Sequence, residues 1–329
     1  MTSQELSGAQ GKEEEVIDCH NHVGVDPYFY LHGDYPYAQD LPAMMENAGA
    51  AGITRWVVFP FVTNLSFDLS PMRKGELVFS GEQTPYAFEN RRLLTEVTEY
   101  FPEYSERVIP FAMVDPLRMP EEQVKELRVL RGEYPICGLK IQATIIQSPI
   151  KSLLKEGTGF LDLAREWDVP FIIHSSVAEN DVWSQASDIL DVVEQNPDIR
   201  FCVAHSCRFD QPCLDRLATL SNAWFDCSAH RIHCESVIRG LPNVAPEERR
   251  LPGDYSDPTE ILSTMYRRYP DKLLWGSDSP FYSWITKTGR FPFALKTRYA
   301  LETECLWALP EAARKAISSA NTRRYLYGK

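Results

Sequence analysis

The chain has 329 residues, of which 44% are hydrophobic and 24% charged, and its formal net charge is -12. Such an acidic balance argues against sequence-independent binding to nucleic acid or to an anionic membrane, because both reward clustered basic side chains. No stretch approaches the roughly 18 continuous apolar residues of a membrane span, and the amino terminus lacks a signal-peptide pattern. We therefore expect one large domain in the cytoplasm.

Strand-like and helix-like segments alternate along most of the chain. Residues 1–15 are polar and without apolar periodicity, so we expect a disordered tail there and a single folded domain over residues 16–329. Eight apolar segments have strand character: 16–22, 55–60, 108–114, 136–141, 169–174, 201–205, 223–228 and 273–278. Helical patterns occupy the following segments: 41–51, 86–101, 121–131, 159–167, 184–195 and 298–326. Eight strands with helices between them predict an α/β fold, a closed (β/α)8 TIM barrel.

Two histidines stand two residues apart at the end of the first predicted strand. Side chains two apart on a strand share a face, so His20 and His22 can bind one metal ion together. Alone, such a pair is more often hydrogen-bonded packing. Three further predicted strands, however, end in a residue that can bind metal, namely His174, His205 and Asp278. The carboxyl ends of barrel strands meet at one face, so the sequence predicts a metal site there.

This ordered set of four histidines and one aspartate resembles the metal-dependent amidohydrolase superfamily. It is most similar to the amidohydrolase-related subgroup, which holds hydrolases and also decarboxylases such as aminocarboxymuconate semialdehyde decarboxylase. The resemblance extends from about Val16 to Tyr327. It includes Gly-Leu-Lys at 138–140, Trp-Gly-Ser-Asp-Ser-Pro at 275–280 and Asn-Thr-Arg-Arg-Tyr-Leu-Tyr at 321–327.

The resemblance implies a site for one divalent metal ion, most often Zn²⁺, with Mn²⁺ as the other candidate. It implies four ligands: His20, His22, His174 and Asp278. It makes His205 a catalytic residue beside the ion, and Asp278 a proton acceptor as well as a ligand. Neutral imidazoles with one carboxylate suit zinc, and an open coordination position lets the ion act as a Lewis acid. Gly276 shares a face with Asp278 and would leave room for the ion and its water.

Cationic side chains near the barrel mouth have several interpretations. In some relatives a lysine at the position of Lys140 is carbamylated and bridges two metals. In this subgroup it resembles a cation facing the substrate, which we favour, and an ion pair is the third interpretation. Arg208 and Arg231 follow the sixth and seventh strands, where a guanidinium could bind a substrate carboxylate. His230 and His233 lie in the same loop as Arg231, and each faces either the mouth or solvent.

Two loops are candidates for shaping a pocket. The tyrosine-rich loop over residues 27–37 either walls a pocket or packs against the barrel rim. The long connection over residues 61–85 is a candidate lid, because long loops without regular structure tend to be functional.

Two enzymatic functions fit these residues. The first is a metal-dependent hydrolase that cleaves an amide, lactone or related acyl bond of a small carboxylated substrate through a metal-activated water, with His205 and Asp278 handling protons. The second is a non-oxidative decarboxylase of a small aromatic or unsaturated acid at the same metal site. A metal-binding barrel without catalysis is disfavoured by the intact proton-transfer residues. We expect the hydrolase first, and the resemblance also admits a homodimer.

Overall fold

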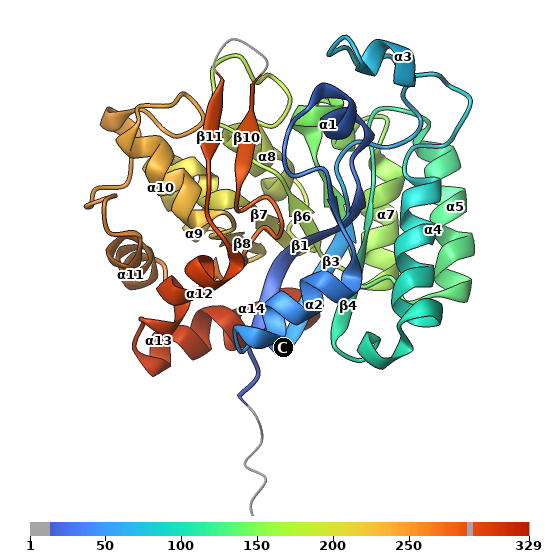
Figure 1. The fold of residues 1–329 in the computed structure, drawn as a ribbon. Helices are drawn as coiled ribbons and strands as arrows, with labels where there is room; N and C mark the ends of the chain where they lie inside the picture. The colour runs from blue at the N-terminus through green and yellow to red at the C-terminus, as the bar shows by residue number, and fades with distance from the viewer. Residues whose placement is uncertain (1–13, 288–291, 329) are drawn as a thin grey trace, which may run out of the picture.

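The computed structural model describes residues 14–287 and 292–328 (Figure 1). Residues 1–13, which make up most of the predicted tail, lie outside the described residues, so that prediction stays a prediction. Glu14 pairs with Arg314 at 3.1 Å, while Glu15 pairs with Arg323 at 2.9 Å and with Arg55 at 3.2 Å. The pairs with Arg314 and Arg323 join the start of the described chain to its carboxyl-terminal segment.

Nine strands form one curled sheet with the order β2-β1-β3-β4-β5-β6-β7-β8-β9. Their bounds are β1 Ile17–Val25, β2 Ala38–Gln39, β3 Arg55–Pro60, β4 Val108–Met113, β5 Gly138–Ile141, β6 Phe171–Ile173, β7 Phe201–Val203, β8 Ala223–Asp226 and β9 Leu273–Leu274. Only β2 runs antiparallel to its neighbour, whereas each of the other pairs is parallel. A separate hairpin joins β10 (Trp284–Thr286) to β11 (Phe293–Leu295).

The chain after β9 closes the sheet into a ring. Asp278 donates its N–H to the carbonyl of His20 at 2.9 Å, and His22 donates to Ser279 at 2.7 Å. Asn21 and Ser279 form a parallel bridge. The predicted (β/α)8 barrel is therefore confirmed, and its eight strands are β1 and β3 to β9.

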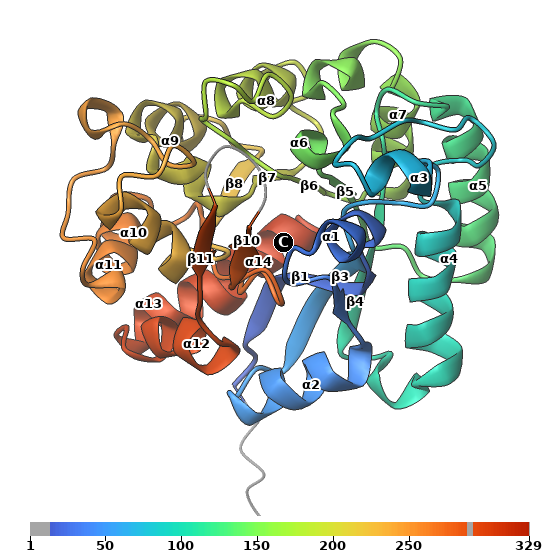
Figure 2. The same ribbon diagram turned by 45° about the horizontal axis from the view of Figure 1, so that its top comes forward.

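Helices surround the ring (Figure 2). Their bounds are α1 Pro27–His32, α2 Leu41–Ala50, α3 Leu69–Met72, α4 Ala87–Thr95, α5 Pro120–Glu133, α6 Ala143–Ile146, α7 Thr158–Trp167, α8 Ala186–Glu194, α9 Gln211–Ala218, α10 His230–Ile238, α11 Pro258–Arg268, α12 Tyr299–Trp307, α13 Glu311–Lys315 and α14 Asn321–Tyr327. In the part of the chain that the structure describes, no helix is long and apolar enough to cross a membrane.

The predicted helices are present, but α3, α6, α9, α10 and α11 were not predicted. The description of residues 27–37 as a loop is wrong over α1. There Asp26 caps the helix by accepting the N–H of Phe29 at 2.9 Å, and Pro27 occupies the first turn. Asp-Pro is a strong signal for a helix start, and the tyrosine-rich composition concealed it.

The strands are buried on both faces, as a parallel barrel requires. Val57, Ile172 and Cys202 belong to one apolar cluster, and their chain neighbours Val58 and Ile173 belong to another that includes the helix side chains. Because successive strand residues point to opposite faces, the first cluster fills the barrel and the second packs between strands and helices. A filled interior leaves the open end of the barrel for a site.

The glycine of the predicted Gly-Leu-Lys motif tests this packing. A Cβ on Gly138 would lie 2.2 Å from Cε2 of Phe111, which is buried in the barrel. We expect Gly138→Ala to lower the free energy of unfolding by about 1–3 kcal/mol through overpacking, measured by urea denaturation. Gly49→Ala is the matched control, because a Cβ there meets nothing within 4 Å and alanine favours the helix. Equal stabilities of the two variants would contradict the packing argument.

Candidate active site

The side chains predicted to bind metal meet at the carboxyl ends of the barrel strands. His20 and His22 lie in β1, and their Nε2 atoms are 3.2 and 3.5 Å from Oδ1 of Asp278. His205, just after β7, places Nδ1 3.8 Å from the other oxygen of Asp278. Ligand atoms of His20, His205 and Asp278 all lie within 4.8 Å of one another.

His174 reaches this cluster through His205. Its Nδ1 is 2.9 Å from Nε2 of His205, and its own Nε2 is 3.2 Å from an Arg208 nitrogen. Burial lowers the pKa of both histidines well below the ordinary value, so both rings are neutral at pH 7. His205 donates from Nδ1 to Ser228, so each ring accepts at one nitrogen and donates at the other. The structure thus places His205 nearer to Asp278 than His174, and the role of His174 as a ligand stays a prediction.

The tautomer of His22 is fixed by a backbone carbonyl. His22 donates from Nδ1 to the carbonyl of Pro60 at 2.9 Å, and a carbonyl can only accept. Burial lowers the pKa of His22 to about 4, so its Nε2 carries a lone pair at neutral pH. That lone pair faces the carboxylate of Asp278, which also only accepts. Two acceptors turned toward each other in a buried site fit a cation between them, and two imidazoles with a carboxylate suit a borderline divalent ion.

Lys140 lies beneath this cluster and is fully buried. Its Nζ is 3.2 Å from Nε2 of His20 and 4.7 Å from the ring centre of Phe59. Burial lowers its pKa to about 8, although Asp226 and Asp278 oppose the shift. Among residues 14–287 and 292–328, no carboxylate forms an ion pair with Lys140, so the ion-pair interpretation has no support.

A left-handed turn over residues 205–209 brings His205 and Arg208 to one cavity. The φ angles of its five residues lie between 47° and 65°, although none is glycine. This conformation costs an L-residue about 1–2 kcal/mol, so the surroundings must hold it. Asp226 accepts the N–H of His205 at 2.9 Å, and Arg208 donates from Nε to the carbonyl of Ser175 at 2.8 Å. Residues three apart in this turn, His205 and Arg208, both line the cavity.

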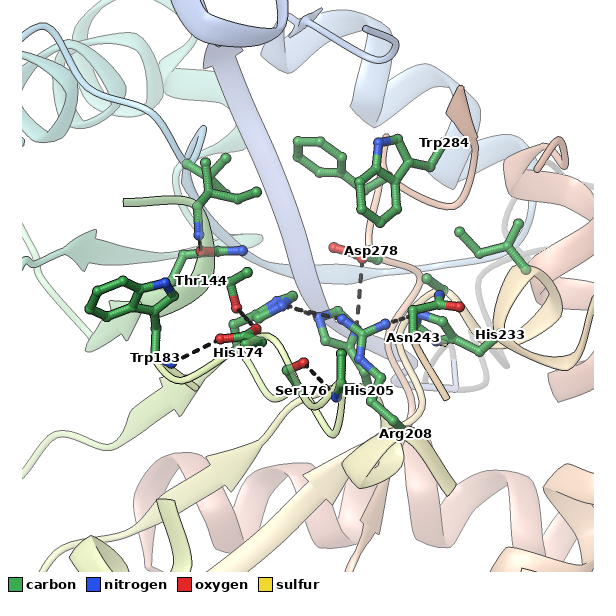
Figure 3. A pocket seen from close by; sticks show the side chains of 18 of the residues that line it. Thr144, His174, Ser176, Trp183, His205, Arg208, His233, Asn243, Asp278 and Trp284 are labelled. Carbon is green, nitrogen blue, oxygen red and sulfur yellow. Dashed lines mark hydrogen bonds and ion pairs between the residues drawn. The ribbon is translucent and has the colours of Figure 1, made fainter. Parts of the chain in front are cut away.

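The cavity encloses about 290 Å³ above the predicted metal ligands. Its floor is polar and includes His22, Lys140, His174, His205, Arg208 and Asp278, and its walls include Phe29, Ile145, Trp183, Ile232, Phe281 and Trp284. Figure 3 shows Arg208 between His174 and His233 at the base, with Trp183 and Trp284 on the walls. A polar floor under aromatic walls suits a small, partly apolar molecule.

Arg208 is a buried cation without an acidic partner. Its side chain donates to Ser175 and to ring nitrogens of His174 and His233, and only 7% of it is exposed. Within the described part of the chain, no carboxylate lies at ion-pair distance from it. Burial lowers its pKa only to about 10, so it stays charged at neutral pH. An unpaired buried guanidinium fits an anionic ligand.

The structure does not bring Arg231 to the cavity. Its Nη1 contacts the carbonyl of Leu301 at 3.3 Å and Sγ of Cys305 at 3.7 Å, because α10 turns this side chain outward. His230 also points away, donating to the carbonyl of Pro258 at 2.7 Å, whereas His233 lines the cavity. The role of Arg231 in substrate binding has no geometric support.

The segments predicted as loops, residues 27–37 and 61–85, contribute few side chains to the cavity. From residues 27–37 only Phe29 lines the cavity, whereas Tyr30 and Tyr37 are exposed. From residues 61–85 only Val62 lines it. The role of this connection as a lid stays a prediction.

The prediction that Gly276 leaves room for a metal ion and its water is wrong. A Cβ there would lie 2.9 Å from Cβ of His20 and 3.1 Å from Sγ of Cys19. The missing side chain therefore makes room for β1 and not for an ion and its water.

Asp226, at the end of β8, was not predicted. It is fully buried, and its Oδ2 lies 3.0 Å from Nδ1 of His20. The alternation of the run Ala-Trp-Phe-Asp signals this residue, because it places Asp226 on the same face as Trp224, inside the barrel.

With the site described, comparison with known proteins identifies the family. Residues 17–328 match the family described as Amidohydrolase, and the chain belongs to it. It is an enzyme of the amidohydrolase superfamily, and the resemblance to the amidohydrolase-related subgroup is confirmed. No curated protein matches the chain.

Solved structures share the fold at low sequence identity. A 5-carboxyvanillate decarboxylase from Novosphingobium aromaticivorans, in complex with manganese, is 12% identical over 99% of both chains, with a TM-score of 0.59. A probable 2-pyrone-4,6-dicarboxylic acid hydrolase from Acinetobacter baumannii is 16% identical over 96% of this chain and 100% of that one, with a TM-score of 0.56. At these identities the likeness establishes the fold alone.

Buried Glu302, next to Arg231, gives a prediction about pH. Its carboxyl group lies 3.3 Å from the backbone nitrogen of Arg231, and burial raises its pKa to about 8. The folded state therefore binds a proton that the unfolded state releases above its ordinary pKa of 4.5. Stability from this group is present below pH 4.5 and is lost as the pH rises toward 8.

We expect Glu302→Gln to be more stable than the parent at pH 8.5 by several kcal/mol, and the gap to shrink at pH 5. Thermal unfolding at both pH values measures the difference. A gap that is constant with pH would contradict the assignment.

Proposed function

We propose that the protein is a metal-dependent hydrolase that cleaves an amide, lactone or related acyl bond of a small carboxylated substrate. The proposed site holds one divalent ion, preferably Zn²⁺, through His20, His22, His174 and Asp278. The observation that carries the proposal is the position of the His20 and His22 Nε2 atoms against the Asp278 carboxylate, on the floor of a cavity that also contains a buried cation.

The bound ion would supply Lewis acidity for the substrate carbonyl and lower the pKa of water. The protein's own groups do the rest. Asp278, whose carboxylate lines the cavity, accepts a proton from the attacking water, and its Oδ2 lies 3.8 Å from Nδ1 of His205. The Nδ1–H of His205, which donates to Ser228 in this structure, would then donate to the developing negative charge instead, and His174 stabilises the ring by donating to its other nitrogen. The aromatic walls exclude bulk water from these transfers.

Arg208 binds the substrate carboxylate in this proposal. Its guanidinium is charged, buried and next to His174, so a carboxylate would replace neutral ring nitrogens as its acceptor. Charge-assisted bonds of this kind are stronger than bonds to a neutral imidazole. The carboxylate would thus anchor one end of the substrate while the scissile bond lies over the metal ligands.

A non-oxidative decarboxylase is the second candidate, and the position of Arg208 favours it. This cation is in direct contact with His174, so a carboxylate that it binds lies close to the reacting centre itself. A decarboxylase must hold the departing carboxylate at that place. The similar 5-carboxyvanillate decarboxylase, which covers 99% of this chain, shows that the fold hosts such chemistry.

The metal content of the purified protein tests the site. We expect about one equivalent of zinc or manganese per chain by elemental mass spectrometry, and its loss in a His20→Ala/His22→Ala double variant. Two equivalents would assign Lys140 as a carbamylated bridging ligand. No metal after reconstitution would refute the proposed function.

Proton transfer is tested by isosteric changes. We expect His205→Asn to retain metal and fold but to lower turnover of the best acyl substrate by roughly two to four orders of magnitude. Asp278→Asn should abolish turnover. His230→Asn is the matched control, because His230 is equally buried but points away from the cavity. Equal losses in His205→Asn and His230→Asn would remove His205 from the mechanism.

Carboxylate recognition is tested with each candidate substrate as the free acid and as its methyl ester. Arg208→Met should raise KM for the acid by about 30-fold or more, the loss expected for charged hydrogen bonds, and should leave the ester little changed. Arg231→Met provides the same substitution outside the cavity. An Arg208→Met effect of equal size on acid and ester would exclude carboxylate binding by Arg208.

A further inference from the structure

We infer that Asp226 is a positioning residue of the metal site, which fixes the tautomer and orientation of His20 and thereby sets the affinity of the site for a divalent ion. The statement about metal affinity rests on the proposed function. The statement about His20 concerns the protein alone and is tested separately below.

The carboxylate of Asp226 uses its two oxygens for different tasks. Oδ2 accepts from Nδ1 of His20 at 3.0 Å and from the thiol of Cys202 at 3.5 Å. Oδ1 accepts the backbone N–H of His205 at 2.9 Å, the backbone N–H of Ser228 at 3.0 Å and the Ser228 hydroxyl. One oxygen therefore orients a histidine of β1, and the other holds the start of the left-handed turn.

Asp226 is fully buried and surrounded by hydrogen-bond donors. The backbone N–H groups of His205 and Ser228, the Ser228 hydroxyl and the Cys202 thiol all donate to its two oxygens, and such a set of donors favours the carboxylate form. A carboxylate can only accept, so Nδ1 of His20 must carry the proton.

This proton fixes the other side of the ring. With the proton on Nδ1, the lone pair of the His20 ring lies on Nε2, which is 3.2 Å from Asp278 and 3.2 Å from Lys140 Nζ, a group that can only donate. The lone pair thus points at the place where the metal would bind. In metal sites, carboxylates that hold a ligating histidine in this way typically change affinity by 10–100-fold.

Asp226→Asn separates the two tasks of the carboxylate. Three donors surround Oδ1, so the amide oxygen of asparagine takes that place and preserves the turn. The amide NH₂ then faces Nδ1 of His20 and can only donate. His20 must accept at Nδ1, which moves its proton to Nε2 and removes the lone pair from the metal site.

The first measurement is proton–nitrogen correlation NMR of the imidazole rings in the metal-free protein. The chain has seven histidines, and the His20 signals are assigned by their loss in His20→Gln. We expect the Nδ1–H tautomer in the parent and the Nε2–H tautomer in Asp226→Asn. Ser228→Ala, which removes a hydroxyl from Oδ1 and leaves the His20 contact intact, should keep the Nδ1–H tautomer.

The second measurement is Zn²⁺ affinity, determined by competition with a chelating dye. We expect Asp226→Asn to bind Zn²⁺ at least about tenfold more weakly than the parent, with a melting temperature within about 4 °C. An unchanged His20 tautomer would overturn the inference, and so would a changed tautomer with Zn²⁺ affinity within twofold of the parent. If the parent binds no Zn²⁺, the proposed metal function fails while the tautomer result still decides the role of Asp226.

Discussion

The return of the chain onto β1 after β9 is the constraint on which the site depends. Cys19 donates to the carbonyl of Trp275 at 3.1 Å, and Asp278 donates to that of His20 at 2.9 Å. The hydrogen bonds that close the barrel therefore also place the Asp278 carboxylate against the β1 histidines. Gly276 permits this approach, because any side chain there would collide with His20. The same contacts therefore close the barrel and assemble the site.

The balance of buried charge explains what the cavity can accept. Asp226 carries negative charge, Lys140 and Arg208 carry positive charge, and burial keeps His22, His174 and His205 neutral. A divalent ion added to this set leaves an excess of positive charge in a buried place, which is costly without an anion. An anionic substrate and a water that gives up its proton would both offset the excess. The site thus favours carboxylated substrates through its total charge as well as through Arg208.

The sequence predicted those parts of the site that depend on local patterns. His20, His22, His205 and Asp278 stand at strand ends, and hydrophobic periodicity locates strand ends well. The prediction that Arg231 faces the substrate failed for a different reason. The direction of its side chain depends on how α10 starts, and the local sequence does not show this. The left-handed turn could not be foreseen, since no glycine marks it and its stability comes from Asp226, a residue distant in sequence.

The choice between hydrolysis and decarboxylation depends on how close the substrate carboxylate lies to the metal ligands, and not on which residues those ligands are. Both reactions use the same histidines and aspartate, so the position of the substrate carboxylate decides which bond lies over them. Arg208 is fixed next to His174 by the strained turn, and the cavity of about 290 Å³ leaves room for a small molecule only. If the substrate has a single carboxylate and Arg208 binds it, that carboxylate lies next to the predicted metal ligands and decarboxylation is favoured. A hydrolase substrate must therefore carry its acyl bond within a few atoms of the carboxylate, so that both fit above one ion.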